Sequence, residues 1–518
     1  MEKNNKDKNL YSSYYTKSEF ITDYMIEMLN LNETHSVLEP SAGDGVFIDA
    51  LLKQKPNTNI DAYDLNPQAI DVLNNKYDGY SNIQVVESDT LLDMELDMKV
   101  FMNGDYDRVI GNPPYGAWQD YEKRAKLKNI YKGFYVKETY ALFLLRCISL
   151  LKENGVLTFI IPDTFMNLHM HRNLREFLLL NTKIHEILMI PSKFFPGVNF
   201  GYSNLTIITL EKTNKEQALS NTVKIISNLN RASDIEDITN RTNFDKYSVV
   251  DIPQKEIFDS IDMAFLIKAG DKVRYLINNP SLTLSDVADC VTGIYTGNNR
   301  EYFKVLNSQV RNPTKCELVD KNKVEYNYLK YRNLLDGIEG DKHFIPVTKG
   351  NAGMYHRNNE WFIDWGEEAL KHYRTDKKAR LQNSKYYFRK GIAVPMVKSS
   401  KVKASIIDNQ VFDQSVVGIF PKEEKYLNYL LALLNSDIVN TIIQTINHTA
   451  NNSANYLKKI PIVLPKNEND LKYVNNLVNK MIKHIKDKNA LDEKLQIELN
   501  QIFNTLYEYE ELPTKVLG

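Results

Sequence analysis

The chain has 518 residues, of which 43% are hydrophobic, and this length predicts two or three domains because single cores rarely grow so large. The formal net charge of −1 gives no sign of a globally basic protein, and no uninterrupted apolar stretch is long enough to span a membrane. Because residues 1–9 are polar and charged, we expect no signal peptide. The three cysteines lack metal-ligand spacing and fit a reducing cytoplasm.

Short apolar runs alternate with helical patterns along the first half of the chain. We expect strands at 36–38, 59–63, 84–87, 106–110 and 156–161, and helices at 18–29, 46–53, 67–76 and 138–151. Two more strand-like runs lie between Ile184 and Leu210. This rhythm predicts an α/β fold with a mostly parallel, doubly wound sheet.

The character of the sequence changes near residue 240, where regular alternation gives way to irregular, Asn- and Tyr-rich segments. Short strands are expected at 344–347 and 392–397, and helical patterning returns at 425–445 and 469–507. We therefore expect a first domain at 1–245 and a second, α+β domain with C-terminal helices at 246–518.

The tetrapeptide Asn112-Pro113-Pro114-Tyr115 follows an apolar run that ends in Gly111. Two consecutive prolines cannot continue a strand or a helix, so they hold a rigid turn where open α/β sheets bind their ligands. Asn112 offers a carboxamide oxygen and a backbone carbonyl to an amine, and Tyr115 offers a face on which a planar base can stack. The turn suits chemistry on an amino group attached to an aromatic or amide plane. The alternative is a Pro-Pro loop without a catalytic role.

Three acidic residues end successive predicted strands. Glu39 opens the loop Glu39-Pro40-Ser41-Ala42-Gly43-Asp44-Gly45, whose glycines allow the backbone to approach a ligand closely. Its carboxylate can face a cationic sulfonium or ammonium group. Asp64 can accept both hydroxyls of a ribose, and Asp89 can accept from an adenine amine. No G-x-G-x-x-G pattern is present and no lysine follows the glycines, so the loop is a poor pyrophosphate site.

In this order the motifs resemble those of the gamma class of N6-adenine DNA methyltransferases of bacterial restriction–modification systems. The resemblance is carried by Tyr15-Thr16, Leu38 to Gly43, Asp64, Ser88-Asp89 and Asn112 to Tyr115, and it is specific over residues 14–210. It implies a Rossmann-like methyltransferase domain followed by a DNA target-recognition domain. One departure is Lys17, where the family often has proline.

The resemblance also assigns the site. It implies S-adenosylmethionine as the methyl donor, no metal, and a cofactor site made by Thr16, Glu39, Ala42, Gly43, Asp64, Asp89 and Asn112. The target adenine would be flipped out of the duplex. Asn112 and the carbonyl of Pro113 would accept hydrogen bonds from its N6 amine, and Tyr115 and Phe195 would stack on its two faces. For Phe195 the alternative is an ordinary core residue.

Basic residues point to double-stranded DNA as the partner. One cluster contains Lys123 and Arg124, and the run 371–403 holds eleven Lys/Arg against one acid, with Lys398, Lys401 and Lys403 at its end. Arg332 lies in a patch, 330–334, similar to part of the family's target-recognition domain. For each cluster the alternative is a solvated charged face. We expect a monomer in the bacterial cytoplasm, without membrane contact, and a separate cognate restriction endonuclease remains possible.

Other functions remain open at this point. The Asn-Pro-Pro-Tyr turn also occurs in enzymes that methylate a protein glutamine or a base in RNA, and N4-cytosine DNA methylation is a nearer alternative. The cytosine enzymes more often carry serine in place of Asn112. A catalytically inactive DNA-binding specificity protein is the alternative from another class. We see no convincing nuclease motif, and the Tyr15-Thr16 motif begins too early for a fused N-terminal nuclease.

Overall fold

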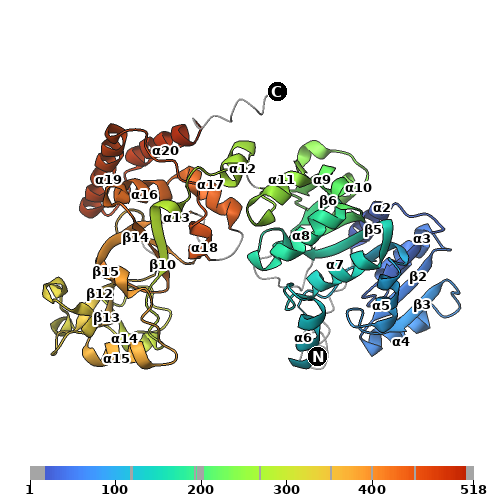
Figure 1. The fold of residues 1–518 in the computed structure, drawn as a ribbon, viewed down its shortest axis with the longest axis horizontal. Coiled ribbons are helices and arrows are strands. Elements are labelled where there is room, and N and C mark those ends of the chain that lie inside the picture. Colours follow the sequence, from blue (N-terminus) through green and yellow to red (C-terminus); the bar gives the residue numbers. More distant parts are fainter. Residues whose placement is uncertain are drawn as a thin grey trace. The chain divides into compact units, whose positions relative to one another are not determined.

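The structure is a computed structural model that describes residues 18–116, 121–191, 194, 204–267, 270–350, 353–397, 401–447 and 451–508. It divides into two compact units, residues 1–267 and 268–518 (Figure 1). Each unit has its own sheet and its own hydrophobic core.

The first unit is built on a nine-stranded sheet with the order β3-β2-β1-β4-β5-β7-β6-β8-β9. The strands are β1 (Ser36–Glu39), β2 (Asn59–Asp64), β3 (Ile83–Glu87), β4 (Tyr106–Gly111), β5 (Leu151–Pro162), β6 (Thr182–Ile190), β7 (Leu205–Lys212), β8 (Thr222–Ser227) and β9 (Ser248–Pro253). Strands β1 to β5 pair in parallel, and β7 is antiparallel to both β5 and β6. The expected doubly wound sheet is confirmed.

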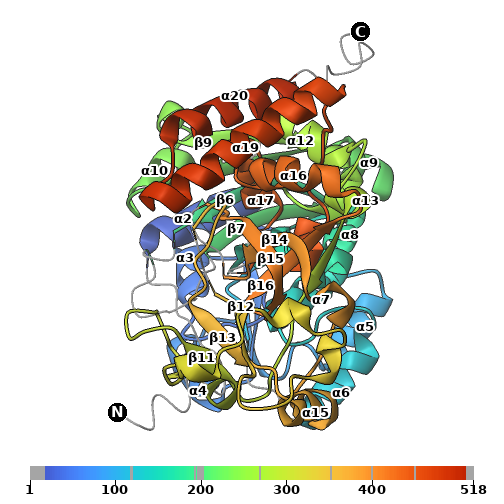
Figure 2. The same ribbon diagram turned by 90° about the vertical axis from the view of Figure 1, so that its left-hand side faces the viewer.

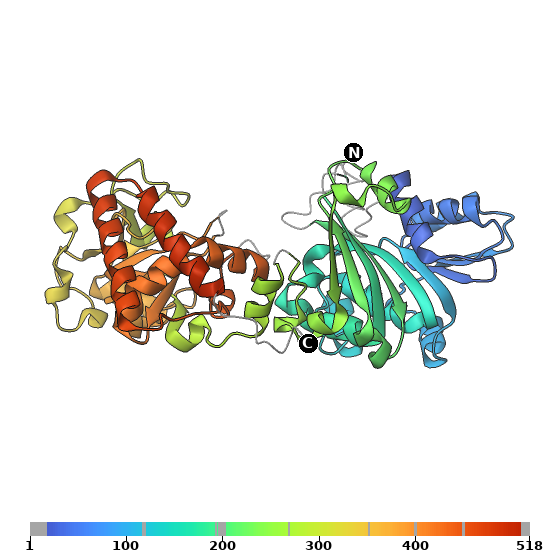
Figure 3. The ribbon, with the colours of Figure 1, turned by 90° about the horizontal axis from the view of Figure 1, so that it is seen from above.

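Helices cover both faces of this sheet (Figure 3). They are α2 (Glu19–Leu29), α3 (Val46–Gln54), α4 (Pro67–Lys76), α5 (Met94–Phe101), α6 (Tyr121–Ile130), α7 (Thr139–Leu150), α8 (Arg172–Asn181), α9 (Lys215–Ser220), α10 (Asp234–Thr239) and α11 (Gln254–Asp259). Helix α7 is buried along almost its whole length, which agrees with its nearly continuous apolar sequence. The strands beneath it are apolar on both faces, as parallel strands between helix layers require.

The first unit continues beyond the expected boundary at residue 245. Strand β9 pairs antiparallel with β8, from Thr222 opposite Pro253 to Ser227 opposite Ser248, and completes the edge of the sheet. Helix α11 then packs against α8 and α9. The chain therefore leaves the first unit only after Ile267.

The second unit contains a seven-stranded, mostly antiparallel sheet with the order β10-β16-β14-β15-β12-β13-β11. Its strands are β10 (Ala288–Thr292), β11 (Phe303–Val305), β12 (Phe344–Thr348), β13 (Trp361–Asp364), β14 (Arg389–Pro395), β15 (Ser405–Phe412) and β16 (Val416–Pro421). Trp365, Ile345 and Phe412 lie in the core beside this sheet. The expected α+β character of this half is confirmed.

Helices gather at the C-terminal end of the second unit, where α19 and α20 run beside each other (Figure 2). The helices of this unit are α12 (Asp271–Asn278), α13 (Leu284–Val287), α14 (Asn299–Tyr302), α15 (Glu367–Thr375), α16 (Leu427–Leu434), α17 (Asp437–Ile446), α18 (Ala454–Leu457), α19 (Glu468–Lys488) and α20 (Glu493–Glu508). The helical stretch expected at 425–445 is interrupted, because Ser436 caps a new helix by accepting from Val439 N–H. The stretch at 469–507 breaks at Asn489, which adopts the left-handed conformation.

Within the described residues, no single helix has both the length and the apolar content needed to cross a membrane. The helical segments Glu424–Leu434 and Asp437–Ile446, which meet at 75°, reach those limits only when they are taken together.

Candidate cofactor and target-base site

Four side chains singled out in the sequence lie along one edge of the first sheet. Because β3, β2, β1 and β4 are neighbours and run in parallel, their carboxyl ends meet at that edge. Glu39 and Asp64 end β1 and β2, Asn112 follows β4 directly, and Asp89 lies two residues after β3. The residues therefore stand in the spatial order Asp89, Asp64, Glu39, Asn112. Open α/β sheets bind ligands outside this edge.

The loop after β1 is shaped by two glycines with positive φ, Gly43 at 56° and Gly45 at 78°. A Cβ atom on Gly45 would lie 2.4 Å from the Tyr77 hydroxyl oxygen, so no side chain fits there without movement. That hydroxyl donates to the Gly45 carbonyl at 2.9 Å, and the Lys76 amine donates to the Asp44 carbonyl at 3.0 Å. The C-terminal end of α4 thus fixes the conformation of the loop through these two hydrogen bonds.

Asp64 organises the same loop from the neighbouring strand. One carboxylate oxygen accepts from Gly43 N–H and the other from Asn66 N–H, each at 2.8 Å. Ala42 N–H donates to the Tyr63 carbonyl at 2.9 Å, which adds a second tie between the two strand ends. Burial raises the pKa of Asp64, and the hydrogen bonds from Asn66 and Gly43 oppose that rise. Asp64 therefore shapes the glycine loop as well as standing where a ribose acceptor is expected.

Glu39 is the most deeply buried acid of the row, with 1% of its surface exposed. Its Oε2 atom is buried without a hydrogen-bond partner. Burial, together with the nearby carboxylates of Asp64 and Asp44, raises the pKa of Glu39 well above its ordinary value. The charge of Lys76 opposes this rise, but the acidic surroundings prevail. Such a buried carboxyl group is matched by a cationic ligand, because a positive charge stabilises the ionised form. The sulfonium or ammonium group of S-adenosylmethionine fits this requirement.

Asp89 forms an ion pair with Lys123, a residue that the sequence predicts to bind DNA. Its carboxylate contacts the Lys123 amine at 2.6 Å and accepts from Leu91 N–H at 3.1 Å. Lys123 lies on α6, so this helix reaches back over the end of β3. The geometry associates Lys123 with the cofactor end of the site, and its expected role in binding DNA stays a prediction.

The Asn112-Pro113-Pro114-Tyr115 turn is held by three hydroxyl groups. The Tyr115 hydroxyl donates to Asn112 Oδ1 at 2.5 Å, and the ring of Tyr115 is buried. Ser41 Oγ donates to the Asn112 carbonyl at 3.3 Å, and Thr139 Oγ1 donates to the Pro114 carbonyl at 2.5 Å. Pro113 is buried, and its neighbours Asn112 and Pro114 are half-buried.

Thr139 and its neighbours were missed in the sequence. Thr139 begins α7 and is buried, and Glu138 before it contacts buried His171 Nε2 at 2.7 Å. Thr90 is another missed residue, and its hydroxyl donates to the Pro40 carbonyl at 2.7 Å. Its position directly after Asp89 was an available signal. Nothing local marks Thr139, because it is brought to the turn only by the packing of α7.

The remaining residues selected in the sequence fall into two groups. Thr16, Phe195 and Lys398 lie outside the described residues. Arg332 and Lys403 are exposed, Lys401 pairs with Asp437 at 3.0 Å, and the half-buried Arg124 has a buried Nε without a partner. Among the residues that the structure describes, no three His, Cys, Asp or Glu side chains group in a way that could hold a metal ion.

Comparison with known proteins agrees with this geometry. Residues 49–195 match the family model of the Eco57I restriction-modification methylase. This part of the chain is therefore similar to a methylase of the restriction–modification type. The matched residues include Asp64, Asp89 and the Asn112 turn, so the methylase match covers three of the four strand ends described above, and Glu39 lies before it.

Relatives extend the similarity beyond the methylase domain. The type II methyltransferase M.HindII of Haemophilus influenzae is 26% identical over 468 residues, covering 81% of this chain and 82% of the relative. The type II methyltransferase M.AccI of Acinetobacter calcoaceticus is 28% identical over 284 residues, covering 53% and 49% respectively. Among solved structures, the type IIL restriction-modification enzyme MmeI in complex with DNA has a TM-score of 0.55 at 10% identity, covering 99% of this chain and 76% of that one. This likeness concerns the fold.

Proposed function

We propose that this protein is a site-specific DNA methyltransferase that uses S-adenosylmethionine to methylate the N6 amine of adenine in duplex DNA. The observation that carries the proposal is the row of strand ends Asp89, Asp64, Glu39 and Asn112. Their chemistry matches, in spatial order, an adenine amine, a ribose, a cationic centre and the amine of a target base. S-adenosylmethionine supplies an electrophilic methyl group when it is bound.

Asn112 and the carbonyl of Pro113 accept hydrogen bonds from the target amine. The lone pair of an aromatic amine is delocalised into the ring, which makes the nitrogen a poor nucleophile. Two acceptors on its hydrogens favour a more tetrahedral nitrogen and stabilise the positive charge that develops on it. The chain then has mainly to position the amine for in-line attack, and the ties from Ser41 and Thr139 to the turn serve that purpose.

The target base has to leave the duplex, because its amine is hidden inside the stack. Tyr115 supplies one stacking face, and we assign the opposite face to Phe195. The Tyr115 hydroxyl bonds to Asn112 Oδ1, so the same residue also orients the acceptor. Stacking is worth about 1–3 kcal/mol per base, comparable with the cost of extrusion.

The second unit, under this proposal, recognises the target sequence in duplex DNA. Exposed Arg332 and Lys403 are candidate phosphate contacts, together with Arg124 of the first unit. We infer a monomer that acts on DNA in the bacterial cytoplasm and requires no metal. A separate cognate endonuclease is compatible with such an enzyme.

A transfer assay tests the proposal. The purified chain is incubated with duplex DNA and S-adenosylmethionine labelled in its methyl group, and the DNA is hydrolysed to nucleosides for mass spectrometry. Labelled N6-methyladenine supports the proposal, whereas labelled N4-methylcytosine corrects the base. Label that enters RNA or protein instead of DNA, or label in no acceptor, contradicts it. Asn112→Ala serves as the inactive control, and modification-sensitive sequencing then reads the recognised sequence.

A further inference from the structure

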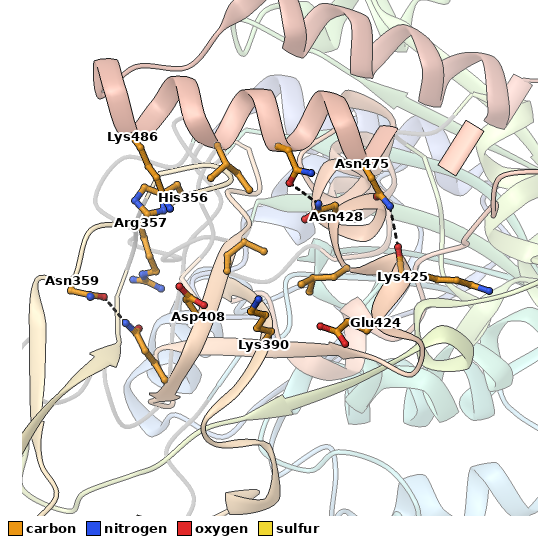
Figure 4. Close-up of a pocket in the computed structure, with 15 residues that line it drawn as sticks. His356, Arg357, Asn359, Lys390, Asp408, Glu424, Lys425, Asn428, Asn475 and Lys486 are labelled. Atoms are coloured by element: carbon orange, nitrogen blue, oxygen red, sulfur yellow. Dashed lines mark hydrogen bonds between the residues drawn. The ribbon is translucent and has the colours of Figure 1, made fainter. Parts of the chain in front are cut away.

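One cavity, far along the chain from the methylase residues, lies wholly within the second unit. It has a volume of about 450 Å³ and is walled by α19, the start of α16, β15 and the segment 356–359 (Figure 4). Small-molecule sites typically have volumes of this order. Its lining is polar, so an apolar ligand does not suit it.

One side of this cavity is rich in positive charge. Figure 4 shows His356, Arg357 and Lys486 gathered on one side, with Lys390 near the middle. Within the described part of the chain, the side-chain amines of Lys390 and Lys486 make no ion pair and no hydrogen bond. Four lysine and arginine side chains line the cavity, and Lys425 among them pairs with Glu423 at 2.7 Å. The other three stand against two lining carboxylates, of which Asp408 faces this side. The cavity therefore keeps an excess of positive charge.

The electrostatics of the cationic side agree with this count. Burial lowers the pKa of His356, and the charge of Lys486 lowers it further while Asp408 opposes. Burial also lowers the pKa of Arg357 to about 10, and the nearby carboxylates of Asp413 and Glu360 oppose that shift. A bound anion would stabilise the protonated form of both side chains.

The opposite side of the cavity offers amides. Asn428 Nδ2 donates to Asn479 Oδ1 at 3.1 Å, and Asn475 Nδ2 donates to the Lys425 carbonyl at 3.3 Å. The Oδ1 atom of Asn475 is buried without a partner. A buried acceptor of this kind requires a donor, and Glu424, which also lines the cavity, is a second acceptor.

We propose that this cavity binds a nucleotide, with its phosphate against Lys390, Lys486 and Arg357 and the N–H or O–H donors of its base or sugar against Asn475 and Glu424. An inorganic anion leaves the amide side unsatisfied, and a neutral nucleoside leaves the cationic side unsatisfied. The ligand has two sources, a free nucleotide or a nucleotide within a DNA strand, which share this chemistry. The inference does not depend on methyl transfer.

Calorimetry on the full chain tests the site. The four 2′-deoxynucleoside 5′-monophosphates, inorganic phosphate and the four nucleosides are titrated in the presence of saturating S-adenosylhomocysteine, which fills the proposed cofactor site. We expect one monophosphate to bind at least about tenfold more tightly than either phosphate or its nucleoside. Lys390→Gln with Lys486→Gln should lose that affinity by about tenfold or more. Asn475→Ala should weaken the binding of the monophosphate and leave the affinity for inorganic phosphate unchanged.

A matched control uses two exposed lysines of α19 that do not line the cavity, Lys480→Gln with Lys483→Gln. Fluorescence anisotropy with a labelled duplex then separates the two sources. If the ligand is a nucleotide within a DNA strand, the Lys390/Lys486 variant should reduce the salt-dependence slope of DNA binding by about 0.9 log unit per lost phosphate contact. The monophosphate should then also compete with DNA. A free nucleotide predicts DNA binding equal to that of the control.

The proposal is overturned if no monophosphate binds and the Lys390/Lys486 variant matches the control in DNA binding. It is equally overturned if inorganic phosphate binds as tightly as every monophosphate. Loss of methyl transfer in the wild-type chain leaves both titrations unaffected and bears only on the proposed function.

Discussion

The buried carboxyl group of Glu39 leads to a prediction about protons. Its pKa is raised well above the ordinary value of 4.5, chiefly by burial and then by Asp64 and Asp44. Between 4.5 and the raised value, the cofactor-free chain holds a proton that a free carboxyl group would have lost. A cationic ligand beside Glu39 favours the ionised form, so binding of S-adenosylmethionine should release this proton.

The expected magnitude follows from linkage. Release of one proton makes affinity rise about tenfold per pH unit over the range below the raised pKa. The slope should be close to zero in Glu39→Gln, which keeps the shape of the side chain and cannot ionise. Burial also raises the pKa of Asp64, so any slope that remains in this variant reports on Asp64.

The raised pKa of Glu39 also predicts how the stability of the folded chain changes with pH. Because the folded form of Glu39 binds its proton more tightly than the unfolded form, the stability that this group contributes is fully present below about pH 4.5 and is lost as pH rises towards the raised pKa. Glu39→Gln should therefore stabilise the cofactor-free chain at neutral pH, as measured by thermal unfolding, while it weakens cofactor binding.

Calorimetric titration in buffers with different ionisation enthalpies measures the released protons directly. The wild-type chain should release about one proton per bound S-adenosylmethionine, and Glu39→Gln should release almost none. S-adenosylhomocysteine lacks the sulfonium charge but keeps the ammonium group, so it shows which cation Glu39 meets. A binding enthalpy that is independent of the buffer in the wild-type chain would refute the reasoning.

Four substitutions test the rest of the site. Asn112→Ala should reduce methyl transfer by about a hundredfold or more and leave cofactor affinity nearly intact, because Asn112 is assigned to the target amine. Asp64→Ala should weaken cofactor binding by roughly ten- to a hundredfold in calorimetry and also lower the melting temperature, since Asp64 holds Gly43 and Asn66. Tyr115→Phe keeps the ring but removes the bond to Asn112, and should lower single-turnover transfer by about tenfold. Thr139→Val should lower kcat with little change in cofactor affinity, because it releases the Pro114 carbonyl at a cost of about 1–3 kcal/mol.

Each substitution has an outcome that contradicts it. Retention of more than about a tenth of the rate in Asn112→Ala removes that residue from the chemistry. An unchanged dissociation constant in Asp64→Ala leaves Asp64 as a loop-organising acid only. Equal rates for Tyr115→Phe and wild type show that the hydroxyl does not orient Asn112. Thr139→Ser retains the donor and should recover activity, whereas equal loss in serine and valine variants points to packing.

The sequence predicts the first sheet well because its strands alternate with helices and each strand is apolar enough to be buried between two layers. It predicts the end of that unit less well. Strand β9 has alternating exposure along an edge, from Ser248 to Pro253, and such a short half-exposed strand carries little apolar signal. The helices of the second unit were visible as patterns, but their breaks depend on single residues, Ser436 and Asn489.

The sequence identifies candidate site residues only through local motifs, and their roles stay predictions. Glu39, Asp64, Asp89 and Asn112 each follow a strand, and strand order alone brings them to one edge. The sequence did not reveal which side chain or backbone group each of these residues contacts. The pairing of Asp89 with Lys123 depends on how α6 packs and not on any spacing along the chain.

The row of carboxylates also bears on turnover. Glu39 is buried, lacks a partner at Oε2 and lies close to Asp64, so its ionised form depends on the positive charge that it faces. If that charge is the sulfonium, methyl transfer removes it, and Glu39 then regains the proton that it gave up on binding. The site therefore holds the charged methyl donor more tightly than the neutral thioether product. A chain with Glu39→Gln should lose this preference, and the ratio of the dissociation constants of S-adenosylmethionine and S-adenosylhomocysteine measures it. An unchanged ratio would place the ammonium group, which both ligands share, beside Glu39.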